Sequence, residues 1–538
     1  MTVSEYMIDY IIRKGIRDVF CYPGSTLGFF LESLRVRQGA IAAHLNYHEQ
    51  ASAYAACGYS LAAGKPAVCL VMNGPGVTNA LSGIADAYLD SISVIFITAQ
   101  VHTSTYKGAS NIRQIGVQEV DTIALVKPVT KYAKTIVRAD DAPYEMEQAW
   151  QIAVSGRKGP VVLDVPVDVS RTEITECGMA CAGEASALQR YYERFDTKRI
   201  EGAAREVIAA INAGVKPLVI TGAGIRQAGA VEEFKAFIDA AKVPFVTSLP
   251  GHDLYTESPY YEGFIGNLAS GGAVEITNRA DVVAAMGTRL SNRTIAEGNR
   301  DFALRARLVR VDIDEDELTR KVKAEERHVL CDVRLLLERL ASEGRYSDFS
   351  GWAKECEEIR LTENYEGTES KLAKPIADFL EKLPQDAVCV CGRGRSKALA
   401  RRALEHRERA RAYRFLFTAG LGAMGFALPA AIGAYYATRK PVYCFTGDGC
   451  IQMNIQELNY IGHHAIPVTV VILNNHKLGQ ISLFQDKNFS SKYCVSTEDS
   501  GYHAPDYKAL AEAYGVRYAT DLHENRGDPE IIELEFDW

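Results

Sequence analysis

The residues with the clearest chemical potential lie in two short motifs near the carboxy-terminal end. The first is Gly-Asp-Gly at 447–449, and the second is Asn-Asn at 474–475. Asp448 offers a carboxylate and Asn475 an amide oxygen, which are ligands that Mg²⁺ takes and shares with phosphates. Taken alone, each motif is also typical of a structural turn, because Gly, Asp and Asn are common in turns. A metal site therefore requires a fold that brings the two motifs to one place.

The sequence around the motifs predicts such a fold. Residues 441–445 and 468–473 are short apolar runs rich in β-branched and aromatic side chains, which predict buried strands. Residues 454–461 between them have helical spacing. In a strand–helix–strand unit the two strands are parallel, so both motifs lie at the carboxyl edge of the sheet. Open α/β sheets bind ligands at this edge.

Strand and helix patterns alternate along the whole chain and predict an α/β fold with doubly wound parallel sheets. A chain of 538 residues is too long for one core, and we expect about three domains. The polar stretch 171–190 predicts a linker, and the charged, helical stretch 338–370 predicts a second connection. The predicted domains span residues 1–170, 185–340 and 360–538.

Composition excludes several classes of protein. A net charge of −8 gives no basic surface for nucleic acid or an anionic membrane. No apolar run reaches transmembrane length, and residues 1–20 lack a signal pattern. The cysteines are scattered, many of them in apolar runs, which indicates small buried side chains and not a zinc site. We expect a cytoplasmic protein with small-molecule substrates and neither a nucleic-acid nor a membrane partner.

Several longer strings resemble one family of thiamine diphosphate (ThDP) enzymes. Tyr-Pro-Gly at 22–24, HEQASAYAACGY at 48–59 and NGPGVTNALSGIADAY at 73–88 resemble the aminopyrimidine-binding domain of acetolactate synthases in order and spacing. TAGLGAMGF at 418–426 and the Gly-Asp-Gly…Asn-Asn pair resemble the diphosphate-binding domain of the same enzymes. The resemblance covers nearly the whole chain and implies three doubly wound domains: aminopyrimidine-binding, central and diphosphate-binding.

The resemblance implies which residues hold the cofactors. Asp448, Asn475 and the main-chain oxygen near Lys477 would bind Mg²⁺, which holds the ThDP diphosphate. Met424 would keep the cofactor in its bent shape. Glu49 would hydrogen-bond N1′ of the aminopyrimidine, which helps N4′ remove the proton from C2. The other implied cofactor contacts are Pro23, Gly24, Asn79, Gly422, Gly447, Gly449, Gly479 and Ile481.

Substrate contacts follow from the same resemblance. Gln118 matches a glutamine that reaches toward the thiazolium and the substrate, although a solvated loop is the alternative for it. The family usually has Phe at 117, Met at 480 and Trp at 484, and this sequence departs at all three. A polar Gln480 predicts a polar aldehyde or ketone acceptor. The implied catalytic residues are Glu49, Gln118 and Gln480, and the implied substrate contacts are Ser25, Val117, Gln480 and Phe484.

Two regions depart from the family pattern and leave alternatives. Gly222-Ala223-Gly224 lacks the third glycine of the dinucleotide fingerprint. The strings at 263–267 and 287–293 also depart, so that the FAD found in acetolactate synthases is slightly disfavoured and a central domain that serves assembly is narrowly preferred. Arg393 and Arg395 stand in the region 393–395, where they either contact phosphate or are solvated.

The predicted function is ThDP- and Mg²⁺-dependent decarboxylation of a 2-oxoacid such as pyruvate, followed by addition of the enamine to a carbonyl acceptor. The alternatives are a 2-oxoacid decarboxylase that releases an aldehyde and a non-catalytic binding protein with the ThDP-enzyme fold. The family builds each site between two chains, which implies a homodimer or homotetramer. The donor, the acceptor and the need for a regulatory subunit are left open by the sequence.

Overall fold

The computed structural model contains three six-stranded sheets, and every strand pairing within them is parallel. The chain forms two compact units. One comprises residues 1–188, 378–400 and 414–538, and the other comprises 189–377 and 401–413. The structure describes residues 1–108, 110–180, 191, 193–266, 269, 271–295, 302–362, 370–384, 387–394, 414–523 and 527–535.

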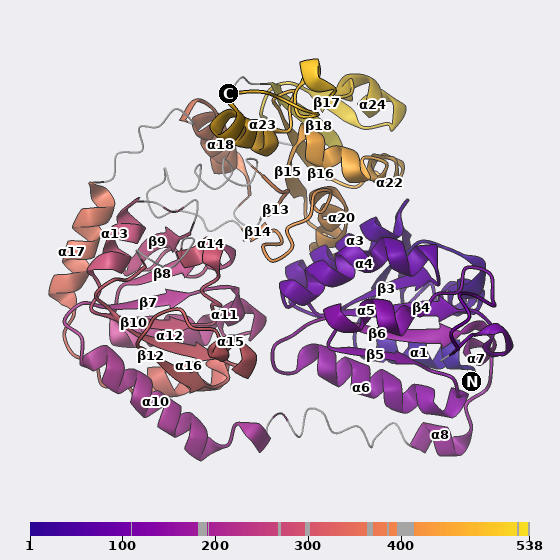
Figure 1. Cartoon of the computed structure of the whole chain (residues 1–538), viewed down its shortest axis with the longest axis horizontal. Helices are drawn as coiled ribbons and strands as arrows, with labels where there is room; N and C mark the ends of the chain where they lie inside the picture. The colour runs from indigo at the N-terminus through magenta and orange to yellow at the C-terminus, as the bar shows by residue number, and fades with distance from the viewer. Residues whose placement is uncertain are drawn as a thin grey trace. The chain divides into compact units, whose positions relative to one another are not determined.

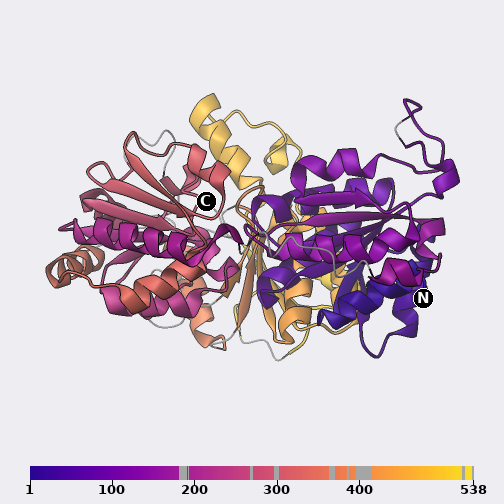
Figure 2. The ribbon, with the colours of Figure 1, turned by 90° about the horizontal axis from the view of Figure 1, so that it is seen from below.

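The amino-terminal sheet has the strand order β2-β1-β3-β4-β6-β5. Alternate residues of its buried strands enter two cores: Val68 and Leu70 face α1, α2 and α6, whereas Cys69 and Val71 face α3 and α4. Helices therefore cover both faces (Figures 1 and 2). The strands are β1 (Asp18–Cys21), β2 (Ala42–Leu45), β3 (Ala67–Met72), β4 (Val94–Gln100), β5 (Tyr132–Thr135) and β6 (Val161–Pro166). The helices are α1 (Val3–Arg13), α2 (Gly28–Val36), α3 (Glu49–Ala63), α4 (Pro75–Leu89), α5 (Thr122–Val126), α6 (Ala142–Val154), α7 (Val167–Ser170) and α8 (Glu176–Ala180).

The carboxy-terminal sheet has the order β14-β13-β15-β16-β18-β17, which repeats the pattern of the amino-terminal sheet. The predicted strand–helix–strand unit is confirmed, because β15 and β16 are parallel neighbours with Gly447 opposite Leu473. The strands are β13 (Val388–Cys391), β14 (Arg414–Leu416), β15 (Val442–Gly447), β16 (Val468–Asn474), β17 (Arg517–Ala519) and β18 (Glu530–Glu535). The helices are α18 (Ser370–Lys382), α20 (Ala427–Thr438), α21 (Asp448–Ile451), α22 (Glu457–His463), α23 (Gly479–Phe489) and α24 (Tyr507–Ala513).

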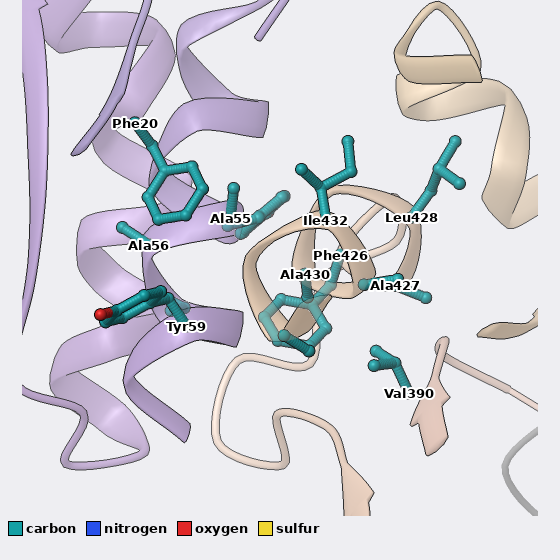
Figure 3. Packing of buried hydrophobic residues seen from close by; sticks show 14 of the residues in the cluster. Phe20, Ala55, Ala56, Tyr59, Val390, Phe426, Ala427, Leu428, Ala430 and Ile432 are labelled. Atoms are coloured by element: carbon teal, nitrogen blue, oxygen red, sulfur yellow. The ribbon is translucent and has the colours of Figure 1, made fainter. Parts of the chain in front are cut away.

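Helices α3 and α20 join these two sheets into one core (Figure 3). They approach closely because glycines occupy the crossing. A Cβ at Gly58 would lie 2.2 Å from the carbonyl oxygen of Ala430, and one at Gly433 would lie 1.8 Å from that of Ala55. Any larger side chain would push the helices apart, so the small residues in both helices fix this contact.

The central sheet has a different order, β12-β11-β10-β7-β8-β9. One core lies between this sheet and helices α10, α12 and α16, and a second includes residues of α13 and α17. The strands are β7 (Pro217–Thr221), β8 (Phe245–Ser248), β9 (Tyr261–Ile265), β10 (Val282–Met286), β11 (Arg307–Asp312) and β12 (Glu326–Leu330). The helices are α10 (Thr197–Asn212), α11 (Ala223–Gln227), α12 (Val231–Ala241), α13 (Gly271–Arg279), α14 (Asn292–Ile295), α15 (Glu315–Thr319), α16 (Val333–Glu343) and α17 (Ser350–Leu361).

Two local features refine the predictions. The predicted linker 171–190 begins with ordered structure, since α8 lies within it. The helix expected over 454–461 starts at Glu457, after a 3₁₀ turn at Gln452–Asn454. Among the described helices, none combines the length and the apolar character that crossing a bilayer requires.

Candidate cofactor and active site

The carboxyl ends of β1 and β3 bring two of the predicted motifs together. These strands are neighbours at the point where the strand order reverses, which is where doubly wound sheets bind ligands. A Cβ at Gly24 would lie 2.6 Å from Sδ of Met72, so the first motif packs directly on the end of β3. The hydroxyl of Thr26 also donates to Oδ1 of Asn73 at 3.1 Å. Pro23 and Ser25 flank this contact and are exposed.

Glu49 is the first residue of α3 and is buried, with 7% of its surface exposed. His48 caps the helix, because its Nδ1 accepts from the backbone N–H of Gln50 at 3.1 Å. Nδ2 of Asn79 donates to Oε2 of Glu49 at 3.0 Å. Oε1 has no hydrogen-bond partner among the described residues, and it faces Gly76, where a Cβ would lie 3.6 Å away. One oxygen is therefore fixed while the other is left for a ligand.

Gln118 lies against the glycine-rich turn after β3. Its carbonyl oxygen accepts from Nδ2 of Asn73 at 2.9 Å, and a Cβ at Gly74 would lie 2.2 Å from it. Gly74 also has φ +60°, so glycine is required here both by conformation and by space. Val117 beside it is 84% exposed. The carboxylate of Glu119 accepts from the backbone N–H groups of residues 115 and 116 and holds the loop in place.

Asp448 begins α21 at the end of β15 and is buried. Its Oδ2 accepts from the Tyr502 hydroxyl at 2.8 Å, and its main-chain carbonyl accepts from the Tyr507 hydroxyl at 3.0 Å. Burial raises the pKa of the Asp448 carboxyl. A divalent cation would favour the charged form again. The carboxylate therefore fits a metal ligand.

The two asparagines at the end of β16 have different surroundings. Asn474 is structural: its Nδ2 donates to Oε1 of Glu533 at 2.7 Å and its Oδ1 accepts from the backbone of His476. The Asn475 side chain is half-buried and holds no hydrogen bond to the described part of the chain. Lys477 pairs with Thr497 in an isolated bridge, which fixes the main chain after the asparagines. Asn475 is thus the member that can offer its oxygen to a cation.

Met424 and Gly449 come together, since a Cβ at Gly449 would lie 3.8 Å from Cε of Met424. Asp86 in α4 and Asp90 directly after this helix hold the loop that leads to Met424. Asp86 accepts from the Thr418 hydroxyl at 3.2 Å and from the Gly422 backbone at 3.2 Å, and burial raises its pKa to about 7. Asp90 accepts from the backbone N–H groups of residues 419 and 420.

Arg393 lies against this loop as well. A Cβ at Gly422 would lie 2.3 Å from Nη1 of Arg393, and the carbonyl of Arg393 accepts from Sγ of Cys450 at 3.3 Å. One arginine of the 393–395 region is therefore beside the glycine loop and the Gly-Asp-Gly turn. Arg395 lies outside the described residues.

Further contacts tie the region before Glu49 to α22. Glu457 is fully buried, and its carboxylate accepts from Nδ2 of Asn46 at 2.9 Å and from the backbone of Tyr47 at 2.7 Å. Burial raises the pKa of Glu457 to about 7. Nδ2 of Asn454 donates both to Oε1 of Gln50 and to the carbonyl of Gly425. These bonds fix the start of α3 and the start of α20 against α22 and the 3₁₀ turn that precedes it.

The remaining predicted site residues lie in the first half of helix α23. A Cβ at Gly479 would lie 3.0 Å from Nδ2 of Asn475, so this glycine leaves room beside the proposed ligand. Gln480, Ile481 and Phe484 are exposed, Phe484 by 56%. Each of them is accessible to a small molecule or to another chain.

Sequence reasoning missed the side chains that hold this site from a distance. Tyr502 and Tyr507 follow Asp448 by more than fifty positions, and Asp86 and Glu457 reach across from other elements. No local pattern signals such contacts. The apolar–polar spacing placed Asp86 and Glu457 on helices, but it did not indicate which residues they contact.

Comparison with known proteins decides the family. Residues 1–125, 204–340 and 395–531 match the models described as thiamine pyrophosphate enzyme N-terminal TPP binding domain, central domain and C-terminal TPP binding domain. Thiamine pyrophosphate (TPP) is ThDP. The acetolactate synthase large subunit of Lactococcus lactis subsp. lactis is 31% identical over 525 residues, 96% of this chain and 87% of that protein. The chain belongs to the acetolactate synthase-like family of ThDP enzymes.

Other relatives agree with this assignment. The acetolactate synthase isozyme 3 large subunit of Escherichia coli is 32% identical over 95% of this chain and 88% of its own length. Acetolactate synthase 1, chloroplastic, of Zea mays is 30% identical over 95% of this chain and 80% of its own length. Within this acetolactate synthase-like chain, the first and third matched regions contain the Glu49 and Asp448 sites respectively, so the ThDP-binding domains are the ones that carry the candidate residues.

Proposed function

We propose that this protein catalyses ThDP- and Mg²⁺-dependent decarboxylation of a 2-oxoacid, with pyruvate as the first candidate, and joins the product to a carbonyl acceptor. The observation that carries the proposal is the pair of half-sites in one chain. One holds a buried glutamate with a single oxygen open, and the other holds a buried aspartate next to an open asparagine.

When bound, ThDP supplies the nucleophile and the electron sink that 2-oxoacid decarboxylation needs. Asp448 and Asn475 are the proposed side-chain ligands of Mg²⁺, with the main chain near Lys477 as a third. Glu49 is the proposed proton-exchanging group, because Asn79 orients one of its oxygens and leaves Oε1 for a ring nitrogen. Gln118 and Gln480 are proposed to contact the substrate.

The test is CO₂ release from pyruvate by the full chain with ThDP and Mg²⁺. Glu49→Gln keeps the shape but cannot exchange the proton, so we expect release to fall by about 10²–10⁴-fold. Glu145→Gln is the matched control, since Glu145 is equally buried at 7% exposure but lies in α6 and bonds the hydroxyl of Tyr132. Equal rates for wild type and Glu49→Gln would refute the proposal. Product analysis with and without an added aldehyde separates ligation from release of an aldehyde.

We further propose a polar aldehyde or ketone as the acceptor. Gln480 is exposed at the start of α23, two positions after Leu478, whose side chain faces Gly449. An amide there can hydrogen-bond a hydroxyl or carbonyl group, and such contacts discriminate strongly between acceptors. Gln480→Met should shift the acceptor profile toward apolar 2-oxoacids, and an unchanged profile would refute this part.

Two other expectations belong to the proposal. We propose a homodimer or homotetramer, supported by the exposed apolar Ile112, Ile115 and Val117 near Gln118, and sedimentation of the purified protein tests it. We also propose that the central domain serves assembly and binds no FAD. The backbone N–H of Gly224 donates to the carbonyl of Gly287 at 2.9 Å, so the glycine turns after β7 and β10 bond to each other. Visible flavin absorbance of the pure protein would refute this.

A further inference from the structure

Two tyrosines hold Asp448 from a segment distant in sequence. The Tyr502 hydroxyl lies 2.8 Å from Oδ2 of the Asp448 carboxylate, and the Tyr507 hydroxyl lies 3.0 Å from its main-chain oxygen. Tyr507 is buried and Tyr502 is half-buried. Tyr502 lies in the connection between α23 and α24, and Tyr507 is the first residue of α24. The same aspartate is thus held at its backbone and at one side-chain oxygen.

The contact from Tyr502 has a specific chemical character. When a carboxylate binds a cation through one oxygen, the group can still rotate unless a hydrogen-bond donor holds its second oxygen. A neutral hydroxyl holds that oxygen and leaves the negative charge that attracts the cation in place. A lysine or arginine in the same position would offset that charge. Hydrogen-bond partners of this kind orient metal ligands and tune their affinity.

The space around Gly449 shows that the hydroxyl lies at the site. A Cβ at Gly449 would be 3.5 Å from Oη of Tyr502 and 2.6 Å from Cδ2 of Leu478. Nε2 of Gln452 is the other polar atom recorded at this hydroxyl, at the longer distance of 3.5 Å. The Asp448 contact is the shorter of the two, so the hydroxyl is committed mainly to the carboxylate.

We propose that Tyr502 is a positioning residue for the metal site: its hydroxyl holds one oxygen of Asp448 and directs the other toward Mg²⁺, and it thereby sets the Mg²⁺ concentration at which ThDP binds. This inference rests on the proposed function, because it needs Asp448 as a metal ligand. It assigns to Tyr507 a different task, that of fixing the backbone of the turn.

The test is Tyr502→Phe, which removes a single oxygen. ThDP binding to the full-length protein is measured by calorimetry over a range of Mg²⁺ concentrations, without substrate. We expect the variant to require about 10–100-fold more Mg²⁺ for half-maximal ThDP binding, and excess Mg²⁺ to restore kcat. Tyr255→Phe is the matched control, because Tyr255 donates to Asp239 at 2.6 Å in the central domain. It should leave the Mg²⁺ dependence unchanged.

Asp448→Asn separates the possible failures. If Asp448→Asn removes Mg²⁺-dependent ThDP binding while a folded Tyr502→Phe behaves as wild type, the positioning role is overturned and the proposed function stands. If Asp448→Asn itself leaves Mg²⁺-dependent ThDP binding intact, the proposed metal site is wrong and this inference falls with it. Thermal melting of each variant verifies that the loss of binding is not a loss of folding.

Discussion

The carboxy-terminal and central sheets are both six-stranded and parallel, yet different residues lie at the point where the strand order reverses. In the carboxy-terminal sheet that point lies between β13 and β15; Asp448 directly follows β15, and Asn475 with its open amide directly follows β16. In the central sheet it lies between β7 and β10, where the backbone of Gly224 bonds that of Gly287 at 2.9 Å. A Cβ at Gly222 would also meet Oγ of Ser248 at 2.5 Å.

The difference teaches that strand order locates a candidate site but does not equip it. Counted along the chain, the central sheet has the order 3-2-1-4-5-6, which is the arrangement of dinucleotide-binding proteins. At its crossing the backbone of Gly224 bonds that of Gly287, and the buried hydroxyls of Thr221 in β7 and Thr247 in β8 have no hydrogen-bond partner in the described part of the chain. The carboxy-terminal edge differs in what it offers: a buried carboxylate at Asp448 and the half-buried amide of Asn475, both of which supply oxygen ligands for a cation.

The largest effect that would sharpen this comparison is expected at Asp448. Asp448→Asn weakens the attraction to a cation, and we expect Mg²⁺-dependent ThDP affinity to fall by more than about 100-fold, which exceeds the loss from a supporting residue. The counterpart is Asp312→Asn at the end of β11 in the central sheet, which should leave ThDP affinity unchanged. Calorimetric titration measures both. An equal loss in both variants would show that the two sheet edges do not differ in this way.

A second test concerns how tightly the site-bearing unit is packed. Gly433→Ala would place a Cβ 1.8 Å from the carbonyl of Ala55, so we expect a loss of about 3 kcal/mol or more in unfolding free energy. Gly202→Ala in α10 has no atom within 4 Å of the new Cβ and should stabilise its unit by up to about 1 kcal/mol. Denaturant unfolding measures both, and a neutral Gly433→Ala would contradict the close helix contact.

A third test separates the two asparagines. Asn474→Ala leaves the buried Glu533 without its amide partner, which should cost about 1–2 kcal/mol of stability and change Mg²⁺ dependence little. Asn475→Ala should do the reverse: stability close to wild type and a strong loss of Mg²⁺-dependent ThDP binding. Thermal melting with and without ThDP and Mg²⁺ distinguishes them. Identical behaviour of the two variants would remove the distinction between the structural and the ligating asparagine.

The smallest effect is a pH dependence at Asp86. Burial raises its pKa to about 7 in the folded protein, so the folded state holds the proton more tightly than the unfolded chain. The resulting stability is present below the unfolded pKa and is lost as pH rises through about 7. Relative to Asp86→Asn, the wild type should lose about 1 kcal/mol between pH 6 and pH 8. A pH-independent difference in the melting temperatures of the two proteins would contradict this.

Much of the sheet structure was predictable because buried strands in parallel sheets are short apolar runs. The strand predicted at 468–473 starts where β16 (Val468–Asn474) starts, and the one predicted at 441–445 overlaps β15 (Val442–Gly447). The shortest strands at sheet edges gave no comparable signal. The outer strands β14 and β17 have three residues each and are partly exposed, so neither apolar pattern nor length marked them. The helix at 176–180 was missed because its 5 residues are too few for a helical period to be detected.

The site was predictable only where it depends on local sequence. Glycine-rich turns and strand ends placed Asp448 and Asn475 at one edge of a sheet, which the pairing of β15 with β16 confirms. The tyrosines that hold Asp448 and the aspartates that hold the Met424 loop act across long sequence separations. Hydrophobic periodicity describes which face of an element is buried, and it contains no information on which distant hydroxyl meets which carboxylate.

The position of β18 has a consequence for how the protein is made. This strand follows all the others of its sheet in the sequence, yet it pairs between β16 and β17 and supplies Glu533 to Asn474. During synthesis, one edge of β16 therefore stays unpaired until β18 has left the ribosome. Unpaired strand edges can pair with other chains. A nascent chain stalled or cleaved before residue 530 would lack the contact from Glu533 that supports the proposed metal-binding turn, and it would be a substrate for chaperones and proteases.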